Sequence, residues 1–277
     1  MPVWFVTGSS RGLGRSIVVR ALEAGHQVAA TARRPEQLQD LVREYGDRVL
    51  PLALDVSDDE AAQNAIAAAA EEFGRLDVVV NNAGYGDTAA VEDMPMDMFR
   101  AQIDTNFYGV VNVSKAALPV LREQGSGHIV QVSSLGGRLA SPGLGAYQAA
   151  KWAVGGFSEV LAQEVAPLGV KVTVLEPGGM RTDWAGSSMT IPEVSEPYRQ
   201  TVGAMVAVVR EGSGIELADP DKVAELVLTV TGLEEPPVRL LVGSDAVRYA
   251  AAVEDARRAT DAKWRELSES VTFESAR

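Results

Sequence analysis

The sequence predicts an α/β fold, a Rossmann-like doubly wound parallel sheet of about seven strands flanked by helices. Short runs rich in β-branched residues alternate with longer segments of helical periodicity, as in chained βαβ units. Several of the short runs are apolar throughout, namely VWFV, LDVVV, HIVQV and VKVTVL. Such strands are buried on both faces, which is typical of a parallel sheet covered by helices. A chain of 277 residues with 46% hydrophobic and 23% charged residues fits one such domain, and we expect a single domain over residues 1–277.

The strands follow from the apolar runs in chain order. They are predicted at Val3–Thr7, Gln27–Thr31, Val49–Leu54, Leu76–Val80, His128–Val132, Val170–Leu175 and Val238–Val242. Ala-, Leu- and Glu-rich segments lie between them, such as Asp58–Phe73 and Tyr147–Ala166, and predict the helices that connect the strands by right-handed crossovers.

Two segments depart from this alternation. The stretch from Pro177 to Pro220 is irregular and rich in Gly, Ser, Pro, Met and Trp, and we expect a substrate lid at about 180–215. Its Met and aromatic side chains favour a hydrophobic substrate, or alternatively pack on the core or a partner subunit. These residues are Met180, Trp184, Met189, Ile191, Tyr198, Met205 and Val206. A charged helical extension is predicted at about 246–277, packed either on its own domain or in a subunit interface.

Composition argues against several classes of protein. The net charge is −13 and no basic stripe is present, so nucleic-acid binding is not expected. There is no cysteine, and His26 and His128 stand alone, so we expect no metal site and place both histidines at the surface or a strand edge. The chain starts with no signal-peptide pattern and has no run of roughly 18 apolar residues, which predicts no membrane span and a cytoplasmic protein.

A glycine-rich turn directly follows the first strand. It reads TGSSRGLG, from Thr7 to Gly14, and leads into the helical run RSIVVRALEAG. Glycines at this point permit a tight turn and let backbone amides approach a pyrophosphate at the helix N-terminus. The alternative is a glycine-rich turn that binds nothing. Its position between a first strand and a helix favours dinucleotide binding.

The end of the second strand indicates which dinucleotide. Sites for NAD place a carboxylate there, hydrogen-bonded to the ribose 2′-hydroxyl. This chain has ATARRP, with Ala32 at that point and Arg33 after it, and a guanidinium suits a 2′-phosphate. Arg11 supplies a second cation, whereas Glu36 leaves room for NAD. We therefore expect NADP(H) rather than NAD(H).

Six ordered motifs resemble the short-chain dehydrogenase/reductase family in its single-domain form. TGSSRGLG is similar to the family's glycine loop, Asp55-Val56 to its adenine contact, and NNAG at 81–84 to the motif that closes the fourth strand. Asn106 in DTNFYGV, Ser134 thirteen residues before Tyr147, and the Tyr147-x-x-x-Lys151 pair resemble its catalytic group. Pro177-Gly178 with Thr182 resembles the loop that holds the nicotinamide carboxamide.

The resemblance implies a set of site residues. The catalytic residues would be Asn106, Ser134, Tyr147 and Lys151. The cofactor-binding residues would be Gly8, Ser10, Arg11, Gly12, Leu13, Gly14, Arg33, Asp55, Val56, Asn82, Ala83, Gly84, Tyr147, Lys151, Pro177, Gly178, Met180 and Thr182. It also implies that Lys151 binds the nicotinamide ribose, that Asn106 holds a proton-relay water, and that the chain forms a homodimer or homotetramer.

The residues themselves support acid–base chemistry at a carbonyl. A Tyr phenol is protonated at neutral pH and can donate to the oxygen that gains charge as hydride arrives. Lys151, one helical turn from Tyr147, would lower the pKa of the phenol, and Ser134 would hold the substrate oxygen. Neighbouring strand residues point to opposite faces, so only one of Ser133 and Ser134 faces the site, and the family spacing selects Ser134.

These observations predict an NADP(H)-dependent oxidoreductase that acts on the carbonyl or secondary alcohol of a hydrophobic small molecule. Three alternatives remain open. The chain could be a dinucleotide-sensing scaffold without turnover, an NAD-dependent alcohol dehydrogenase of the same family, or a sugar-nucleotide epimerase or dehydratase on the same fold.

Overall fold

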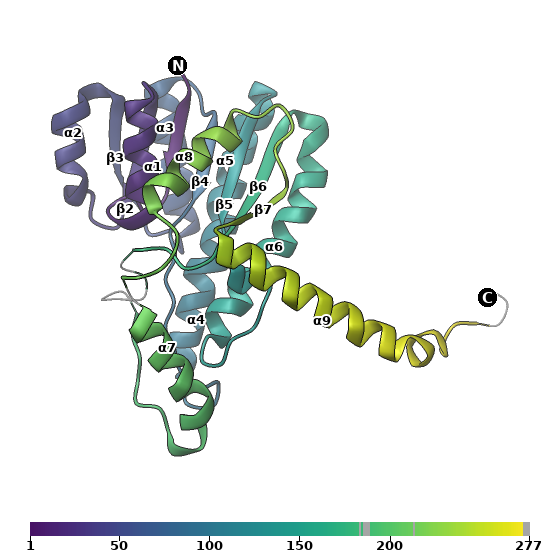
Figure 1. Cartoon of the computed structure of the whole chain (residues 1–277). Helices are drawn as coiled ribbons and strands as arrows, with labels where there is room; N and C mark the ends of the chain where they lie inside the picture. The colour runs from purple at the N-terminus through teal and green to yellow at the C-terminus, as the bar shows by residue number, and fades with distance from the viewer. Residues whose placement is uncertain (183, 185–188, 213, 274–277) are drawn as a thin grey trace.

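The seven strands form one parallel sheet, as the apolar runs predict. The computed structural model describes residues 1–182, 184, 189–212 and 214–273. The strand order is β3-β2-β1-β4-β5-β6-β7, and every neighbouring pair is parallel (Figure 1). The strands are β1 (Val3–Val6), β2 (Gln27–Ala32), β3 (Val49–Ala53), β4 (Val78–Asn81), β5 (Gly127–Val132), β6 (Val170–Pro177) and β7 (Arg239–Val242). This arrangement confirms the predicted Rossmann-like fold class.

Helices cover both faces of the sheet. They are α1 (Gly12–Glu23), α2 (Gln39–Tyr45), α3 (Asp59–Phe73), α4 (Met96–Ile103), α5 (Gly109–Gln124), α6 (Gly145–Val165), α7 (Ala204–Gly212), α8 (Pro220–Thr231) and α9 (Ser244–Glu269). Alternate β1 side chains enter different layers: Trp4 packs in a cluster with α1 and α8, and Phe5 in a cluster with α3 and α5. The two hydrophobic layers explain why β1 is apolar at every position.

The strand order places a crevice at the carboxyl edge of the sheet. β1 lies between β2 and β4, so successive crossovers run outward from it in opposite directions. Loops that leave β1 and β4 therefore diverge, and ligands of doubly wound sheets bind in the gap between such loops. Figure 1 shows helix α7, which belongs to the segment predicted as a lid, below this edge.

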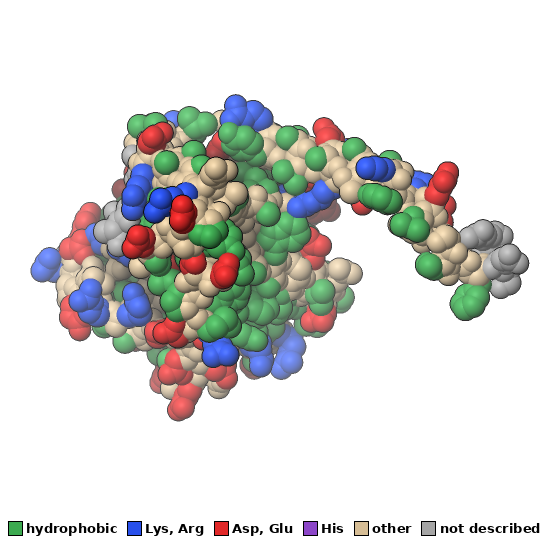
Figure 2. All heavy atoms as spheres, turned by 90° about the horizontal axis from the view of Figure 1, so that it is seen from below, with side chains coloured by type: hydrophobic (Ala, Val, Ile, Leu, Met, Phe, Trp, Pro, Cys, Tyr) green, Lys and Arg blue, Asp and Glu red, His purple; other side chains and the backbone are tan. Residues whose placement is uncertain are grey.

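Helix α9 leaves the body of the protein as an arm (Figures 1 and 2). Ala246 and Ala250 in its first half are buried against the body, whereas Trp264 and Leu267 in its second half are 50% and 65% exposed. Residues 183, 185–188 and 213 of the predicted lid and 274–277 of the predicted extension lie outside the described residues. In the part of the chain that is described, no helix combines the length and apolar character needed to cross a membrane.

The expectation of a surface or strand-edge position is wrong for His128. It lies in β5, between β4 and β6, and is only 3% exposed. Its Nε2 is 2.9 Å from Thr173 Oγ1, a hydroxyl that itself donates to the carbonyl of Pro237. Burial, with a smaller contribution from the charge of Lys171, lowers the pKa of His128 to about 4. His26 is partly buried and stacks on Trp4, with ring centroids 5.7 Å apart.

The lowered pKa of His128 predicts a loss of stability in acid. Below about pH 6.5 the unfolded chain takes up a proton at this histidine, while the folded protein does so only at about pH 4. The free energy of unfolding should therefore fall as the pH drops from 6.5 to 4, by roughly 3 kcal/mol in total. Urea unfolding across this range should show a shallower pH slope for His128→Gln than for the wild type. Identical slopes would exclude His128 as the source.

Candidate active site

A cavity of about 990 Å³ lies at the carboxyl edge of the sheet. It extends from the ends of β1 and β2, past the end of β4, to α6 and the start of α9. The residues predicted for the cofactor and for catalysis line it, except Gly14 and Asn106. The structure thus brings the six motifs to one cavity, although they span residues 7 to 182 of the chain.

The glycine loop after β1 is shaped by backbone contacts. Gly8 and Gly12 have φ angles of +67° and +56°, which disfavour any residue with a side chain. A Cβ atom on Gly14 would lie 2.3 Å from the carbonyl oxygen of Gly8, so α1 can approach the loop only with glycine there. Arg11 occupies the N-cap of α1 and has no acceptor to offer the first-turn N–H groups. This end of the helix is suited to an anion.

The end of β4 is fastened to the glycine loop by hydrogen bonds. Asn82 Nδ2 donates to the carbonyl of Thr7 over 2.9 Å and to the carbonyl of Gly8 over 3.2 Å. Thr7 Oγ1 accepts from the backbone N–H groups of Asn82 and Ala83, each at 2.9 Å. These bonds hold the NNAG motif beside the glycine loop, where Gly84 becomes part of the cavity wall.

The end of β2 provides cationic side chains. Arg33 is exposed and lines the cavity together with Arg11 and two residues that the sequence reasoning did not select, Arg34 and Gln37. Asp55 lines the same region, and its Oδ1 accepts hydrogen bonds from the backbone N–H and the hydroxyl of Ser57. Arg34 directly follows Arg33 in the sequence, and this adjacency could have identified Arg34 as a second residue of the cavity wall.

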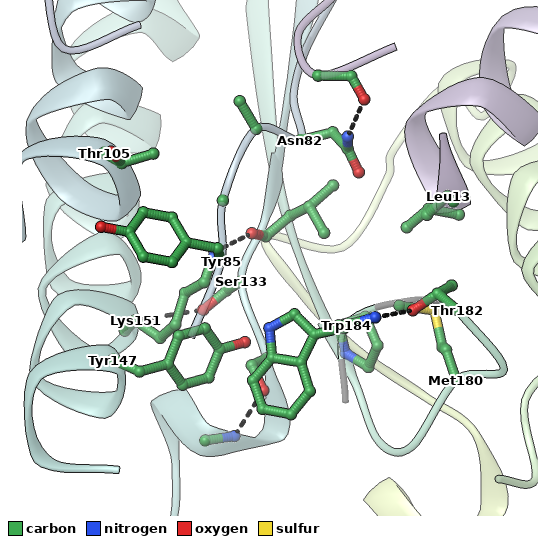
Figure 3. Close-up of a pocket in the computed structure, with 18 of the residues that line it drawn as sticks. Leu13, Asn82, Tyr85, Thr105, Ser133, Tyr147, Lys151, Met180, Thr182 and Trp184 are labelled. Atoms are coloured by element: carbon green, nitrogen blue, oxygen red, sulfur yellow. Dashed lines mark hydrogen bonds between the residues drawn. The ribbon is translucent and has the colours of Figure 1, made fainter. Parts of the chain in front are cut away.

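Helix α6 places Tyr147 and Lys151 one turn apart with both side chains in the cavity. Tyr147 and Lys151 are 7% and 4% exposed. The Lys151 ammonium lies 5.7 Å from the centre of the Tyr147 ring, and its Nζ donates to the carbonyl of Val132 over 2.8 Å. The Tyr147 hydroxyl points into the cavity (Figure 3).

The two adjacent serines after β5 make different contacts. Ser134 hydrogen-bonds Tyr147, and its Oγ accepts from the N–H of Gly136 at 3.0 Å. Ser133 donates to the carbonyl of Lys151 at 3.2 Å. The serine beside the Tyr147 hydroxyl is therefore Ser134, in agreement with the thirteen-residue spacing to Tyr147.

Burial controls the ionisation of both α6 side chains. It raises the pKa of Tyr147 to about 12, against a smaller lowering by the hydrogen bond to Ser134. It lowers the pKa of Lys151 to about 8. The expected lowering of the Tyr147 pKa by Lys151 is therefore not found, because desolvation disfavours the phenolate. Tyr147 is protonated at neutral pH.

Asn106 lies beside the cavity wall instead of lining it. It belongs to a π-helical turn, η3 (Asp104–Tyr108), and is fully buried. Its Nδ2 donates to the carbonyls of Tyr85 and Gln102, both at 2.8 Å, and its Oδ1 accepts from the N–H of Tyr85 at 3.1 Å. These bonds fix the chain directly after Gly84. A relay water at Asn106 stays a prediction.

The side chains of the segment predicted as a lid have two kinds of surroundings, and its role as a lid stays a prediction. Trp184, Met205, Val208 and Val209 line the cavity together with the predicted Pro177, Gly178, Met180 and Thr182. Other lid residues, Ile191, Tyr198 and Val206, pack in a cluster with Ala90 and Val202. The Trp184 indole lies against the Tyr147 ring, with centroids 5.1 Å apart (Figure 3).

Helix α9 contributes two residues that the sequence reasoning missed. Asp245 and Tyr249 line the cavity, and Asp245 Oδ2 accepts a hydrogen bond from the N–H of Gly179 at 2.8 Å. The Ala-rich, charged pattern of this segment indicated a helix but not which loops it contacts.

Comparison with known proteins identifies the family. A family model described as short chain dehydrogenase matches residues 2–190, and the chain belongs to this family of oxidoreductases. Oxidoreductase BOA17 of Botryotinia fuckeliana is 61% identical over 267 residues, which cover 96% of this chain and 97% of that protein. A crystal structure of a short-chain dehydrogenase from Streptomyces avermitilis has a TM-score of 0.92 at 38% identity, covering 98% of this chain and 100% of that one.

Two further similar structures contain dinucleotides. An alcohol dehydrogenase from Thermococcus sibiricus, complexed with 5-hydroxy-NADP, has a TM-score of 0.72 at 28% identity, covering 88% of this chain and 97% of that one. A 3-ketoacyl-(acyl-carrier-protein) reductase from Brucella melitensis, complexed with NADH, has a TM-score of 0.73 at 27% identity, covering 87% of this chain and 96% of that one.

Proposed function

We propose that this oxidoreductase uses NADP(H) to interconvert a carbonyl and a secondary alcohol in a hydrophobic small molecule. One observation carries the proposal: Ser134, Tyr147 and Lys151 meet in the cavity whose other end is the glycine loop. The glycine loop is far from these three residues in the sequence, and neither a ligand-free glycine turn nor a surface Tyr–Lys pair requires the two to share a cavity.

The described residues fit a nicotinamide dinucleotide. The first turn of α1 and the positive-φ glycines at 8 and 12 would receive the pyrophosphate, and Asp55 and Val56 the adenine. Pro177, Gly178 and Thr182 would contact the nicotinamide. When bound, the nicotinamide supplies or accepts the hydride. Dinucleotides bound to the similar structures support this choice of cofactor.

Tyr147 would manage the proton. Its raised pKa keeps the hydroxyl protonated, so it can donate to a carbonyl oxygen without further tuning. Ser134 would bind the same oxygen and stabilise its developing charge. In the oxidation direction Tyr147 must accept a proton instead, and the positive charge of Lys151 would then stabilise the phenolate.

The apolar part of the cavity wall supports a hydrophobic substrate. Leu139, Leu144, Trp184, Met205 and Val208 line it. Apolar walls with a few convergent polar groups are typical of small-molecule sites, and Met adapts to irregular shapes.

A substrate panel run with both cofactors tests the proposed function. Purified protein should oxidise NADPH fastest with hydrophobic ketones and aldehydes, and NADH more slowly. Tight dinucleotide binding without turnover across the panel would favour the non-catalytic scaffold. Turnover confined to sugar nucleotides would favour an epimerase or dehydratase.

Cofactor choice depends on Arg33 in this proposal. Charge-assisted bonds to a 2′-phosphate are worth about 1.5–3 kcal/mol, so Arg33→Ala should raise the KM for NADPH by roughly 10- to 100-fold and leave the KM for NADH nearly unchanged. Arg43→Ala removes the same charge from an exposed position on α2 outside the cavity and is the control. An equal rise in the KM for NADPH and in the KM for NADH would refute this role of Arg33 and favour NAD as the cofactor.

A homodimer or homotetramer is also proposed. The exposed apolar side chains on the second half of α9, Trp264 and Leu267, support burial against another subunit (Figure 2). Sedimentation velocity would measure the subunit count. The cytoplasmic location stays a prediction.

A further inference from the structure

A fully buried carboxylate lies at the edge of the candidate active site. Glu176 is 0% exposed and directly precedes the Pro177-Gly178 turn. Its Oε2 accepts from Arg138 Nε at 2.6 Å, and its Oε1 accepts from Arg239 Nε at 2.9 Å. A buried charge must be paired and hydrogen-bonded to persist in a protein interior, and two guanidinium groups satisfy this one.

Each arginine also binds a second carboxylate closer to the surface. Arg138 Nη1 donates to Glu254 of α9 over 2.7 Å, and Arg239 Nη1 donates to Glu159 of α6 over 2.7 Å. The two outer carboxylates are similarly exposed, at 42% for Glu254 and 48% for Glu159. The result is a run of five alternating charges with Glu176 at its centre, and Arg258 lies 4.0 Å from Glu254 at its α9 end.

The two halves of this network connect to different parts of the protein. Arg138 closes the loop that begins at Ser134 and contains the short helix η4 (Leu135–Gly137). Arg239 starts β7 and is paired with the sheet through β6. Glu254 therefore bonds the residue that closes the Ser134 loop, while Glu159 joins α6 to the first residue of β7.

Helix α9 contacts the Ser134 loop at further points. Leu135 packs in a cluster with Ala246 and Ala250, and Arg257 donates a hydrogen bond to the carbonyl of Arg138. The guanidinium of Arg257 also lies 4.8 Å from the centre of the Trp152 ring on α6. The part of α9 from Ala246 to Arg257 is thus attached to the body where the loop passes.

We propose that α9 is a positioning element of the active site, and that the Glu254–Arg138 ion pair holds Ser134 in place beside Tyr147. Glu254 touches neither substrate nor cofactor in this assignment and acts through Arg138 and the loop. The expected effect of Glu254 on turnover rests on the proposed function. The restraint of the Ser134 loop by α9 does not depend on any reaction.

A matched pair of variants tests this assignment. Glu254→Gln and Glu159→Gln each remove one outer charge from an arginine that keeps Glu176. We expect Glu254→Gln to lower kcat by about 5- to 10-fold with the KM for NADPH within about twofold, because small misplacements of a reacting group are costly. Glu159→Gln should leave kcat within about twofold of the wild type, since Arg239 remains held by Glu176 and by the pairing of β7 with β6. Equal losses of kcat in the two variants would overturn the proposal.

A double-mutant cycle separates positioning from general destabilisation. In a Ser134→Ala background Glu254→Gln should lower kcat no further, because the group that it positions is already gone. Additive losses would contradict action through Ser134.

Hydrogen exchange gives a readout without substrate. Amides of residues 135–139 should exchange about tenfold faster in Glu254→Gln than in Glu159→Gln, as expected for a locally released loop. Unchanged exchange would overturn the hold of α9 on the loop. If the wild type turns over no substrate but these amides still exchange faster in Glu254→Gln, the proposed function is refuted, whereas the restraint of the loop by α9 is supported.

Discussion

Replacing Tyr147 by Phe should lower kcat by about 10²- to 10⁴-fold, the range that a general acid contributes. The Phe ring keeps the packing against Trp184, so the fold and the affinity for NADPH should change little. Only the hydroxyl is lost, and with it the proton donor beside Ser134. Steady-state kinetics with the best ketone of the panel would measure the loss.

The matched control for this change is Tyr45→Phe. It removes a hydroxyl from α2, outside the cavity, and should retain wild-type kcat. Full activity of Tyr147→Phe would rule out Tyr147 as the acid and leave the Ser134 hydroxyl as the remaining donor to test.

Replacing Gly14 by Ala should abolish tight dinucleotide binding. The added Cβ would lie 2.3 Å from both Gly8 O and Asn82 Nδ2, so α1 must move away from the loop or the loop from the end of β4. Overpacking of this kind costs about 1–3 kcal/mol of stability. The displaced helix N-terminus should weaken NADPH binding by on the order of 100-fold. Fluorescence titration and urea unfolding would measure the two effects.

Gly156→Ala is the matched control for this prediction. Gly156 lies within α6, and a Cβ there would meet no atom within 4 Å. It should therefore stabilise the protein by about 0.5–1 kcal/mol and leave NADPH binding unchanged. Unaltered NADPH binding in Gly14→Ala would refute the assignment of the glycine loop to the pyrophosphate.

The sheet could be predicted because apolar runs encode buried parallel strands locally. The observed strands differ from the predicted ones where tertiary contacts determine at which residue a strand begins or ends. β6 continues to Pro177 because Glu176 and Pro177 pair with Leu241 and Val242 of β7. β4 starts at Val78, since the backbone of Leu76 instead bonds the side chain of Gln124.

The site could be predicted as far as its residues belong to short motifs at strand ends. Asp245 and Tyr249 could not be predicted, because their roles depend on where β7 delivers α9. The raised pKa of Tyr147 was missed for a related reason: it follows from burial of the side chain, which packs against Trp184, and sequence spacing does not reveal this burial. Pairing of Glu176 with two distant arginines is likewise a property of the folded chain.

The most direct test of hydride transfer between a nicotinamide and a carbonyl is an isotope-tracing measurement. NADPH carrying deuterium at the transferable position of C4 would be incubated with the protein and the best ketone of the panel, and the product analysed by mass spectrometry. One deuterium on the carbinol carbon of the alcohol is the predicted result. Consumption of the labelled NADPH without deuterium in the product would contradict it.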